Sequence, residues 1–364
     1  MICIFFTTFT AFRHAFYETF LHIHIVLVAL ILGALWVHLK HIPPLILVKV
    51  IIAIWVVERL IRFFTLVYRN LAVGGRNTNA LVETLPGDAM RITLRLARPF
   101  RFKPGQHVFL TLPTVGLWTN HPFSLAWSED PESTPLSARS SSDPEKGMVA
   151  LASPISKTIG NLTCEPATIS IIIRRRGGFT ERLYRKTLTS PRGQLSLPAL
   201  VEGPYGGLNV LDSYGTVMLV AGGVGITHQV PYIRHLVYGY SNGTIASRRV
   251  LLVWIIRSPE HLEWIRPWMT EILALPQRRD VLRVMLFVTR PTSPKEIRSP
   301  SATVQMFPGK PNVGTLVELE CREQIGAMAV GVCGPGGLGD DVREAIRGVQ
   351  QRRNVDLIEE SFGW

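Results

Sequence analysis

The sequence predicts a multidomain protein in which transmembrane α-helices precede an antiparallel β-barrel domain and an α/β domain with a parallel sheet. Three observations indicate this order: an uncharged apolar run near the N-terminus, short alternating segments from about residue 78, and strand–helix alternation after residue 214. The 364 residues are 47% hydrophobic. Part of this apolar content is expected to lie in lipid.

The first membrane helix is predicted at about residues 20 to 39. Phe20 to Leu39 contains no Lys, Arg, Asp or Glu, and its length at about 1.5 Å per residue reaches the roughly 30 Å of a hydrocarbon core. A cleaved signal peptide is the alternative interpretation. No small-residue cleavage site follows the run, and His38, Lys40 and His41 lie where one is expected.

A second membrane helix is predicted at about residues 44 to 63, within a membrane region of residues 1 to 66. Pro43 and Pro44 suit a helix start, and only Lys49 interrupts the apolar residues 45 to 57. Basic flanks of this kind stay in the cytoplasm. Both the N-terminus and the chain after residue 60 are therefore expected to be cytoplasmic; the flanking residues are Arg59, Arg62, Arg69 and Arg76.

The barrel domain is predicted over residues 77 to 207. Its expected strands include Arg91 to Ala97, Gln106 to Leu112 and Thr168 to Arg174, which alternate and are separated by turn residues. Ser128 to Gly147 is rich in Ser, Pro, Glu and Asp. This segment is interpreted as a surface insertion.

The α/β domain is predicted over residues 214 to 364. Strands are expected at Thr216 to Ala221, Val250 to Ile256, Leu282 to Val288 and Met328 to Val332. Helices are expected from Ile226, Pro259 and about Leu338. This alternation is typical of a parallel nucleotide-binding sheet.

Charge and cysteine content narrow the function classes. Lys and Arg outnumber Asp and Glu by 39 to 27, which suits nucleic acid, anionic lipid or a phosphorylated cofactor. The basic residues are dispersed rather than forming a stripe with aromatic residues, so nucleic-acid binding is the poorest of the three. Four widely separated cysteines favour neither a disulfide framework nor a paired-thiol metal site.

Two histidines of the first membrane helix are candidate metal ligands. His24 and His38 are 14 residues apart, which places them within about 40° of one face and about 21 Å apart along the axis. This spacing suits one haem in each leaflet. The alternative is that these histidines hydrogen-bond to neighbouring helices.

Two motifs are candidate sites for a flavin cofactor. His121, Pro122, Phe123 and Ser124 follow a barrel strand and suit the edge of an isoalloxazine ring. Downstream, Gly177, Gly178 and Thr180 precede a predicted helix, whose free amide groups and dipole would hold a pyrophosphate. An ordinary tight turn with Thr180 as N-cap is the alternative for the second motif.

The strand at residues 216 to 221 leads into a glycine-rich turn and a helix start, a degenerate form of the dinucleotide-binding pattern. Arg257 ends the next strand, where an acidic residue is common in NAD-specific sites, so a guanidinium there suits the 2′-phosphate of NADPH. A solvated Arg257 near Glu260 is the alternative. The turn residues are Gly222, Gly223, Gly225 and Thr227.

Two further features complete the candidate site. Cys333 and Gly334 follow a strand and place a thiol at the carboxyl edge of the sheet, beside a nicotinamide. A small buried residue before a turn is the alternative. Phe362 and Trp364 end the chain, and a terminal ring can cover a flavin face and yield to nicotinamide, although terminal aromatic residues also simply pack.

Taken in this order, the motifs resemble the ferric-chelate reductases of the fungal type, in the superfamily that includes NADPH oxidases. The resemblance covers nearly the whole chain, from residues 16 to 18 before the histidine helix to residues 360 to 364. It implies a ferredoxin-NADP reductase-like fold for the two domains and a location of the protein in the plasma membrane. It also implies electron transfer from NADPH through FAD and haem b to an extracytoplasmic ferric or cupric chelate for metal uptake.

One departure from the family concerns the membrane region. Family members carry a second histidine-bearing helix before the one found here, and Met1 to Ala11 resembles only the end of such a helix. The chain is therefore interpreted as N-terminally truncated, with haem binding dependent on a homo-oligomer or a full-length reductase partner. Two alternatives stay open: a superoxide-producing NADPH oxidase, and a haem-deficient flavin reductase or non-catalytic partner.

Overall fold

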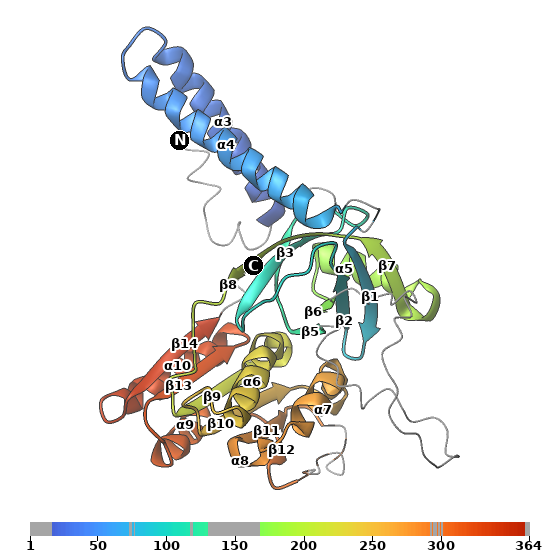
Figure 1. Ribbon diagram of the computed structural model, residues 1–364, viewed down its shortest axis with the longest axis vertical. Helices are drawn as coiled ribbons and strands as arrows, with labels where there is room; N and C mark the ends of the chain where they lie inside the picture. Colours follow the sequence, from blue (N-terminus) through green and yellow to red (C-terminus); the bar gives the residue numbers. More distant parts are fainter. Residues whose placement is uncertain are drawn as a thin grey trace, which may run out of the picture.

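The computed structural model describes residues 17–72, 75, 77–116, 119–129, 168–291, 293, 297, 299 and 301–360. The helices α3 and α4 project from the antiparallel strands, which in turn lie on the parallel-sheet domain (Figure 1). Residues 130–147 of the predicted insertion, and the predicted site residues Phe362 and Trp364, lie outside the described residues.

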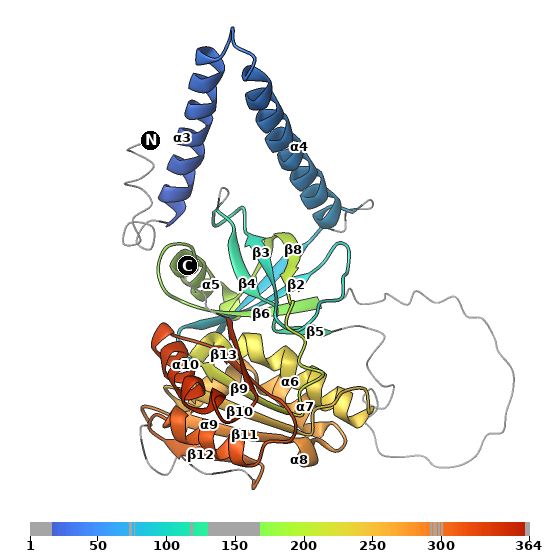
Figure 2. The same ribbon diagram turned by 90° about the vertical axis from the view of Figure 1, so that its left-hand side faces the viewer.

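The membrane region contains helices α3 (Tyr17–His38) and α4 (Leu45–Asn70). The two helices meet at their connecting loop and diverge toward the barrel (Figure 2). Within the described residues, only Thr19–His38 is long and apolar enough to cross a membrane. The prediction of a second membrane helix is not confirmed, because α4 also carries Lys49 and, in its second half, Glu58, Arg59, Arg62 and Arg69.

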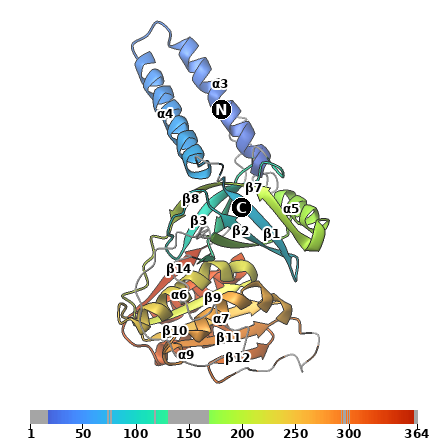
Figure 3. The same cartoon turned by 45° about the vertical axis from the view of Figure 1, so that its right-hand side comes forward.

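The predicted barrel is built from antiparallel strands that share one apolar core. One sheet has the order β5-β6-β2-β1-β7 and the other the order β4-β3-β8. Alternate side chains such as Ile92, Leu94 and Leu110 point into this core, as expected for strands with one buried face. Helix α5 (Gly178–Leu188) lies beside β1 and β7 (Figure 3). The strands are β1 (Asn79–Leu85), β2 (Ala89–Arg95), β3 (Gln106–Thr111), β4 (His121–Ser124), β5 (Trp127–Glu129), β6 (Thr168–Arg174), β7 (Gln194–Pro198) and β8 (Leu200–Gly206).

The second domain is a six-stranded parallel sheet with the order β12-β11-β10-β9-β13-β14. The chain proceeds outward from β9 to β12 and then returns to the other side of β9, so β9 and β13 flank the switch point at which such sheets bind ligands. The predicted antiparallel-then-parallel order is thereby confirmed. The strands are β9 (Thr216–Gly222), β10 (Arg249–Ile256), β11 (Leu282–Val288), β12 (Val304–Pro308), β13 (Met328–Cys333) and β14 (Val355–Glu360).

Helices cover both faces of the parallel sheet. Val217 and Leu219 of β9 pack with α6 (Ile226–Ser241) and α7 (Arg266–Ala274), whereas Met218 and Val220 pack with α9 (Val313–Arg322) and α10 (Gly336–Gln350). Because neighbouring strand residues point to opposite faces, a continuous apolar strand serves both helix layers. The short helices are η2 (Pro191–Gly193), η3 (Gly223–Gly225), η4 (Pro259–Trp264) and α8 (Arg278–Val281).

The sequence predicted a helix from Pro259, and a helix does begin there, but it is short and separate from the α-helix that follows. Pro259–Trp264 is a 3₁₀-helix, and the α-helix begins only at Arg266. Both starts have a proline in the first turn, where the missing N–H has no intrahelical partner to lose. The side chain of Ser258 accepts a hydrogen bond from the Glu260 N–H and so closes the first of these starts.

Candidate functional site at the switch point of the sheet

Two backbone turns touch each other at the switch point between β9 and β13. A Cβ atom on Gly225 would lie 2.1 Å from the Cys333 carbonyl oxygen, and one on Gly334 would lie 3.0 Å from the Gly222 nitrogen. The predicted glycines Gly222, Gly225 and Gly334 are therefore needed for contact between the two turns. The indole N–H of Trp254, on the neighbouring strand β10, donates to the Gly223 carbonyl at 2.9 Å and so holds the Gly222–Gly225 turn in place.

Gly223 differs from the other glycines of this turn. Its φ of +55° favours glycine, and a Cβ there would meet no atom within 4 Å. The open side of the turn can therefore receive a ligand, next to the N-terminus of the 16-residue helix α6. The predicted residue Thr227 is buried, and its hydroxyl donates to the Val224 carbonyl at 2.9 Å. This geometry fits a dinucleotide pyrophosphate on backbone amide groups.

The thiol of Cys333 lies at the carboxyl end of β13, as predicted, and is fully buried. In the parallel register of β13 with β14, Cys333 pairs with Glu360. Burial, and then the negative charge of Glu360, raise the pKa of Cys333. Burial likewise raises the pKa of Glu360. Sequence reasoning named Cys333 as a site residue and included Glu360 only in the C-terminal motif, because the strand that pairs this carboxyl with Cys333 was not predicted.

Helix α6 approaches the start of β3 across the domain boundary, where a Cβ on Gly105 would lie 2.4 Å from the Tyr232 hydroxyl oxygen. The side chain of His228 is 5% exposed, and its pKa is lowered to about 4 by burial and then by His107 of β3. Burial and then Glu360 raise the pKa of Tyr232 to about 12, and its hydroxyl donates to the Asn209 carbonyl at 3.2 Å. Sequence reasoning missed this neutral pair of imidazoles, because no local motif brings the two elements together.

The predicted flavin motif His121 to Ser124 is strand β4 itself. The ring of His121 stacks on Phe179 at 4.5 Å, so this motif and the Gly177 to Thr180 loop lie together. Ser124 is buried and pairs with His107 of β3, whereas Pro122 pairs with Phe109.

The loop before α5 leaves backbone amides available. A Cβ on either Gly177 or Gly178 would meet no atom within 4 Å, and Gly178 has a φ of +57°. Gly177, not Thr180, is the N-cap, without a side-chain cap. The Thr180 hydroxyl instead accepts from the Arg176 N–H at 3.1 Å and donates to the Gly177 carbonyl at 3.2 Å. This loop also fits a pyrophosphate at a helix N-terminus.

Arg257 is exposed immediately after β10, and Arg174 ends β6, a strand that contacts the Gly223–Gly225 turn. Burial and then Arg257 lower the pKa of Arg174. Burial, then Arg174, then Arg257 lower the pKa of His261 to about 4. Two guanidinium groups therefore lie near the nucleotide turn, which suits additional phosphate groups.

The predicted haem ligands lie on one helix. His24 and His38 are both on α3, and α4 contains no histidine. Within the described residues, no group of three or more His, Cys, Asp or Glu side chains is placed to hold a metal ion. All histidines of the two described helices, His22, His24 and His38, lie on α3, so α4 supplies no imidazole opposite them and the two helices do not fit a haem held between two histidines.

The antiparallel strands followed by a parallel sheet, with these glycine turns, suit the binding of a flavin and a pyridine nucleotide. Residues 75–162 match the family model of an FAD-binding domain, and residues 214–347 match that of the ferric reductase NAD binding domain. The chain belongs to the ferric reductase family, which confirms the resemblance found in the sequence.

Curated relatives match nearly the whole chain. It is 27% identical to the ferric/cupric reductase transmembrane component 2 of Saccharomyces cerevisiae over 97% of this chain and 47% of the relative. It is 26% identical to the heavy chain of a superoxide-generating NADPH oxidase of Dictyostelium discoideum over 82% of this chain and 53% of the relative. The chain spans about half the length of the yeast reductases it matches. Among solved structures, the ferredoxin reductase in carbazole 1,9a-dioxygenase has a TM-score of 0.48 and 16% identity, covering 78% of this chain and 68% of that one.

Proposed function

We propose that this chain is the NADPH- and FAD-binding part of a membrane-bound reductase of ferric or cupric chelates. The observation that carries the proposal is the contact of the Gly222–Gly225 and Cys333–Gly334 turns beside the flavin strands, within the matched ferric reductase NAD binding domain. The names of the yeast relatives support a metal chelate as acceptor.

The proposed flavin site combines β4 and the loop before α5. His121, Pro122, Phe123 and Ser124 would lie at the isoalloxazine ring of the cofactor. The free amides at Gly177 and Gly178 would bind its pyrophosphate, in a loop closed by Thr180. When bound, FAD and NADPH supply hydride transfer and the change to single-electron steps.

The proposed nucleotide site uses the switch point. The open turn at Gly223 and the start of α6 would bind the pyrophosphate of NADPH, and Arg257 with Arg174 its 2′-phosphate. The neutral, buried thiol of Cys333 and the carboxyl of Glu360 would line the nicotinamide pocket and exclude water from it. Phe362 and Trp364 are proposed to gate the flavin face.

In the membrane, α3 and the part of α4 up to about residue 63 are proposed to span the bilayer, with the flavin and nucleotide domains in the cytoplasm. The basic residues that follow Val57 support this orientation. His24 and His38 would each offer one imidazole to a haem, and a further helix or a partner chain would have to supply the opposing ligands.

The proposal is tested by expressing the chain, purifying it in mild detergent and recording its absorption spectrum with and without NADPH. Flavin bands that bleach on NADPH addition, together with formation of a ferrous-chelator complex, are expected. A preparation without flavin, or one that oxidises NADPH without reducing ferric chelates, would contradict it. The second outcome should be followed by a superoxide assay, because the Dictyostelium relative bears that activity in its name.

The preference for NADPH is tested at Arg257. The Arg257→Ala variant should lower kcat/KM for NADPH by about tenfold, equivalent to about 1.4 kcal/mol, and leave that for NADH nearly unchanged. Arg266→Ala is the matched control, since Arg266 pairs with Glu263 on the surface. Equal losses of kcat/KM with NADPH and NADH would contradict a role of Arg257 in binding the 2′-phosphate.

A further inference from the structure

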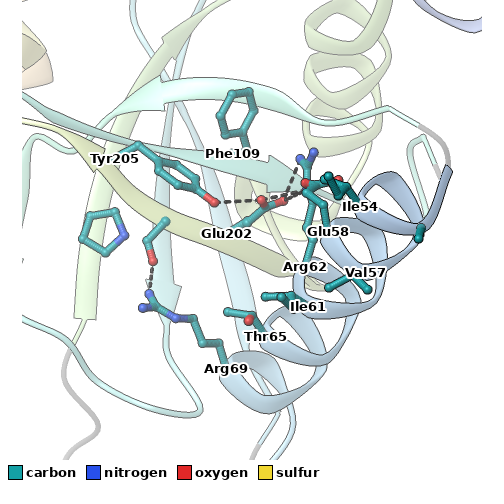
Figure 4. A pocket seen from close by; sticks show the side chains of 13 residues that line it. Ile54, Val57, Glu58, Ile61, Arg62, Thr65, Arg69, Phe109, Glu202 and Tyr205 are labelled. Atoms are coloured by element: carbon teal, nitrogen blue, oxygen red, sulfur yellow. Dashed lines mark hydrogen bonds and ion pairs between the residues drawn. The ribbon is translucent and has the colours of Figure 1, made fainter. Parts of the chain in front are cut away.

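The second half of α4 is attached to strand β8 by polar side chains on one helix face. Arg69 and Asn70 follow Arg62 by seven and eight residues, which places all three side chains on one side of the helix. The Asn70 side chain donates to the Val201 carbonyl at 2.9 Å and accepts from its N–H at 2.8 Å. Arg69 donates to the Gly203 carbonyl. Figure 4 shows Arg62 and Arg69 among the residues that line a pocket of ≈ 840 Å³.

The centre of this attachment is the ion pair of Arg62 with Glu202. The Arg62 guanidinium contacts the carboxylate through Nε and Nη2, at 2.8 to 3.0 Å. The Tyr205 hydroxyl donates to the same carboxylate at 2.8 Å. The Glu202 side chain is only 12% exposed, so water screens this pair less than a surface pair.

Strand β8 connects the ion pair to the flavin strands. Glu202 pairs with Phe109 of β3, and Tyr205 pairs with His107. His107 in turn pairs with Ser124, the predicted isoalloxazine residue of β4. The rings of Tyr205 and His107 are 6.1 Å apart. One continuous set of contacts therefore extends from the membrane-side helix to the proposed flavin site.

We propose that Arg62 and Glu202 are positioning residues that hold the flavin strands at a fixed place beneath the membrane helix, and that electron delivery toward the membrane depends on them. The inference rests on the proposed function, since it needs a flavin in the barrel. Neither residue contacts the proposed flavin or nucleotide turns, so NADPH oxidation with a water-soluble acceptor does not depend on the pair.

The test compares two electron acceptors in one preparation. The full chain is loaded with FAD, reconstituted into phosphatidylcholine vesicles and supplied with NADPH, with either ferricyanide in the water or a quinone dissolved in the bilayer. Each NADPH and one proton reduce one quinone to quinol, or each NADPH reduces two ferricyanide ions and releases one proton. The measured quantity is the ratio of quinone rate to ferricyanide rate.

Arg62→Ala and Glu202→Gln should lower this ratio about ten- to a hundredfold, because small displacements of reacting groups have effects of that size. The exchanged pair Arg62→Glu with Glu202→Arg should recover most of it. Arg59→Ala is the matched control, because Arg59 lies on the same helix and pairs with Glu58. Unchanged ratios in both single variants would overturn the proposal.

Amide hydrogen exchange provides a second measurement that needs no acceptor. Arg62→Ala should speed exchange in residues 200–206 and in the end of α4, whereas Arg59→Ala should not; protection equal to the wild type in β8 would also overturn the proposal. A wild-type chain that reduces ferricyanide but no ferric chelate would remove the proposed acceptor alone, and the comparison of ratios would remain valid.

Discussion

Gly225 illustrates how single residues set the geometry of the nucleotide turn. Its absent side chain lets the turn rest on the Cys333 carbonyl, and the three atoms nearest to an added Cβ are backbone atoms that cannot rotate away. Gly225→Ala should therefore destabilise the chain by about 1 to 3 kcal/mol through overpacking. Urea unfolding followed by tryptophan fluorescence measures this change, since Trp254 donates to the adjacent Gly223 carbonyl.

The matched control is Gly336→Ala, at a position where a Cβ would meet no atom within 4 Å. It should change the free energy of unfolding by less than about 0.5 kcal/mol. Equal effects of the two substitutions would show that the contact between the turns is not what requires Gly225.

His228 gives the stability a defined pH dependence. Its folded-state pKa of about 4 lies below the ordinary value of 6.5, because burial and then His107 disfavour the charged ring. The unfolded chain therefore binds more protons between these values, and this contribution to stability is complete above pH 6.5 and is lost as the pH falls toward 4. From pH 7 to pH 5, the wild type should lose about 2 kcal/mol more than His228→Gln.

Urea unfolding at both pH values measures this difference. Parallel losses in the wild type and the variant would mean that the folded protein accommodates the charged imidazole at residue 228.

At the scale of elements, Asn70 fixes the end of α4 against β8. The side chain is 1% exposed and satisfies both the N–H and the carbonyl of Val201. Asn70→Ala leaves these two backbone groups without partners and should cost about 1 to 3 kcal/mol. The midpoint of thermal unfolding in detergent measures the loss.

Asn79→Ala is the control for Asn70→Ala. Asn79 is exposed, and its side chain makes one long bond of 3.3 Å to a nearby carbonyl. A similar loss of stability in both variants would show that the buried hydrogen bonds of Asn70 contribute little.

The elements also show what the sequence could predict. Apolar strands with a clear period, such as Thr168–Arg174 and Leu282–Val288, lie where they were expected, as does the start of α6 at Ile226. Local patterns determine such elements. Strand β14 was missed, because Val355–Glu360 combines three apolar and three acidic residues without regular alternation, and its place is given by pairing with β13.

In the candidate site, too, residues with a local sequence pattern could be predicted and those without one could not. The positions of the glycine turns and of Cys333 at strand ends could be predicted, because each has a local pattern before or after a strand. The ion pair of Arg62 with Glu202 was not predicted, because the two residues are 140 positions apart in the sequence. Arg62 was interpreted only as a basic membrane flank, and nothing in its neighbours indicates the carboxylate it contacts.

For the whole molecule, the distribution of apolar side chains indicates one unit that folds in water and a helical unit that needs lipid or detergent. The three hydrophobic cores contain only residues between Ala80 and Val355. In contrast, α4 exposes large apolar side chains, for example Leu47 at 63% and Phe64 at 63%. Since exposed patches of this kind need lipid or a partner, the full chain should require detergent, whereas residues 75–364 should be soluble.

Residues 75–364 retain both matched domains and every glycine turn of the proposed sites, so this fragment should bind FAD and reduce ferricyanide with NADPH. Its β8 loses the contacts of Arg62 and Asn70, so it should unfold at a lower temperature than the full chain in detergent. Absorption spectra and thermal unfolding measure both properties. An insoluble or flavin-free fragment would mean that α4 is part of the folding unit, and that the joint with β8 is required to form the flavin site as well as to position it.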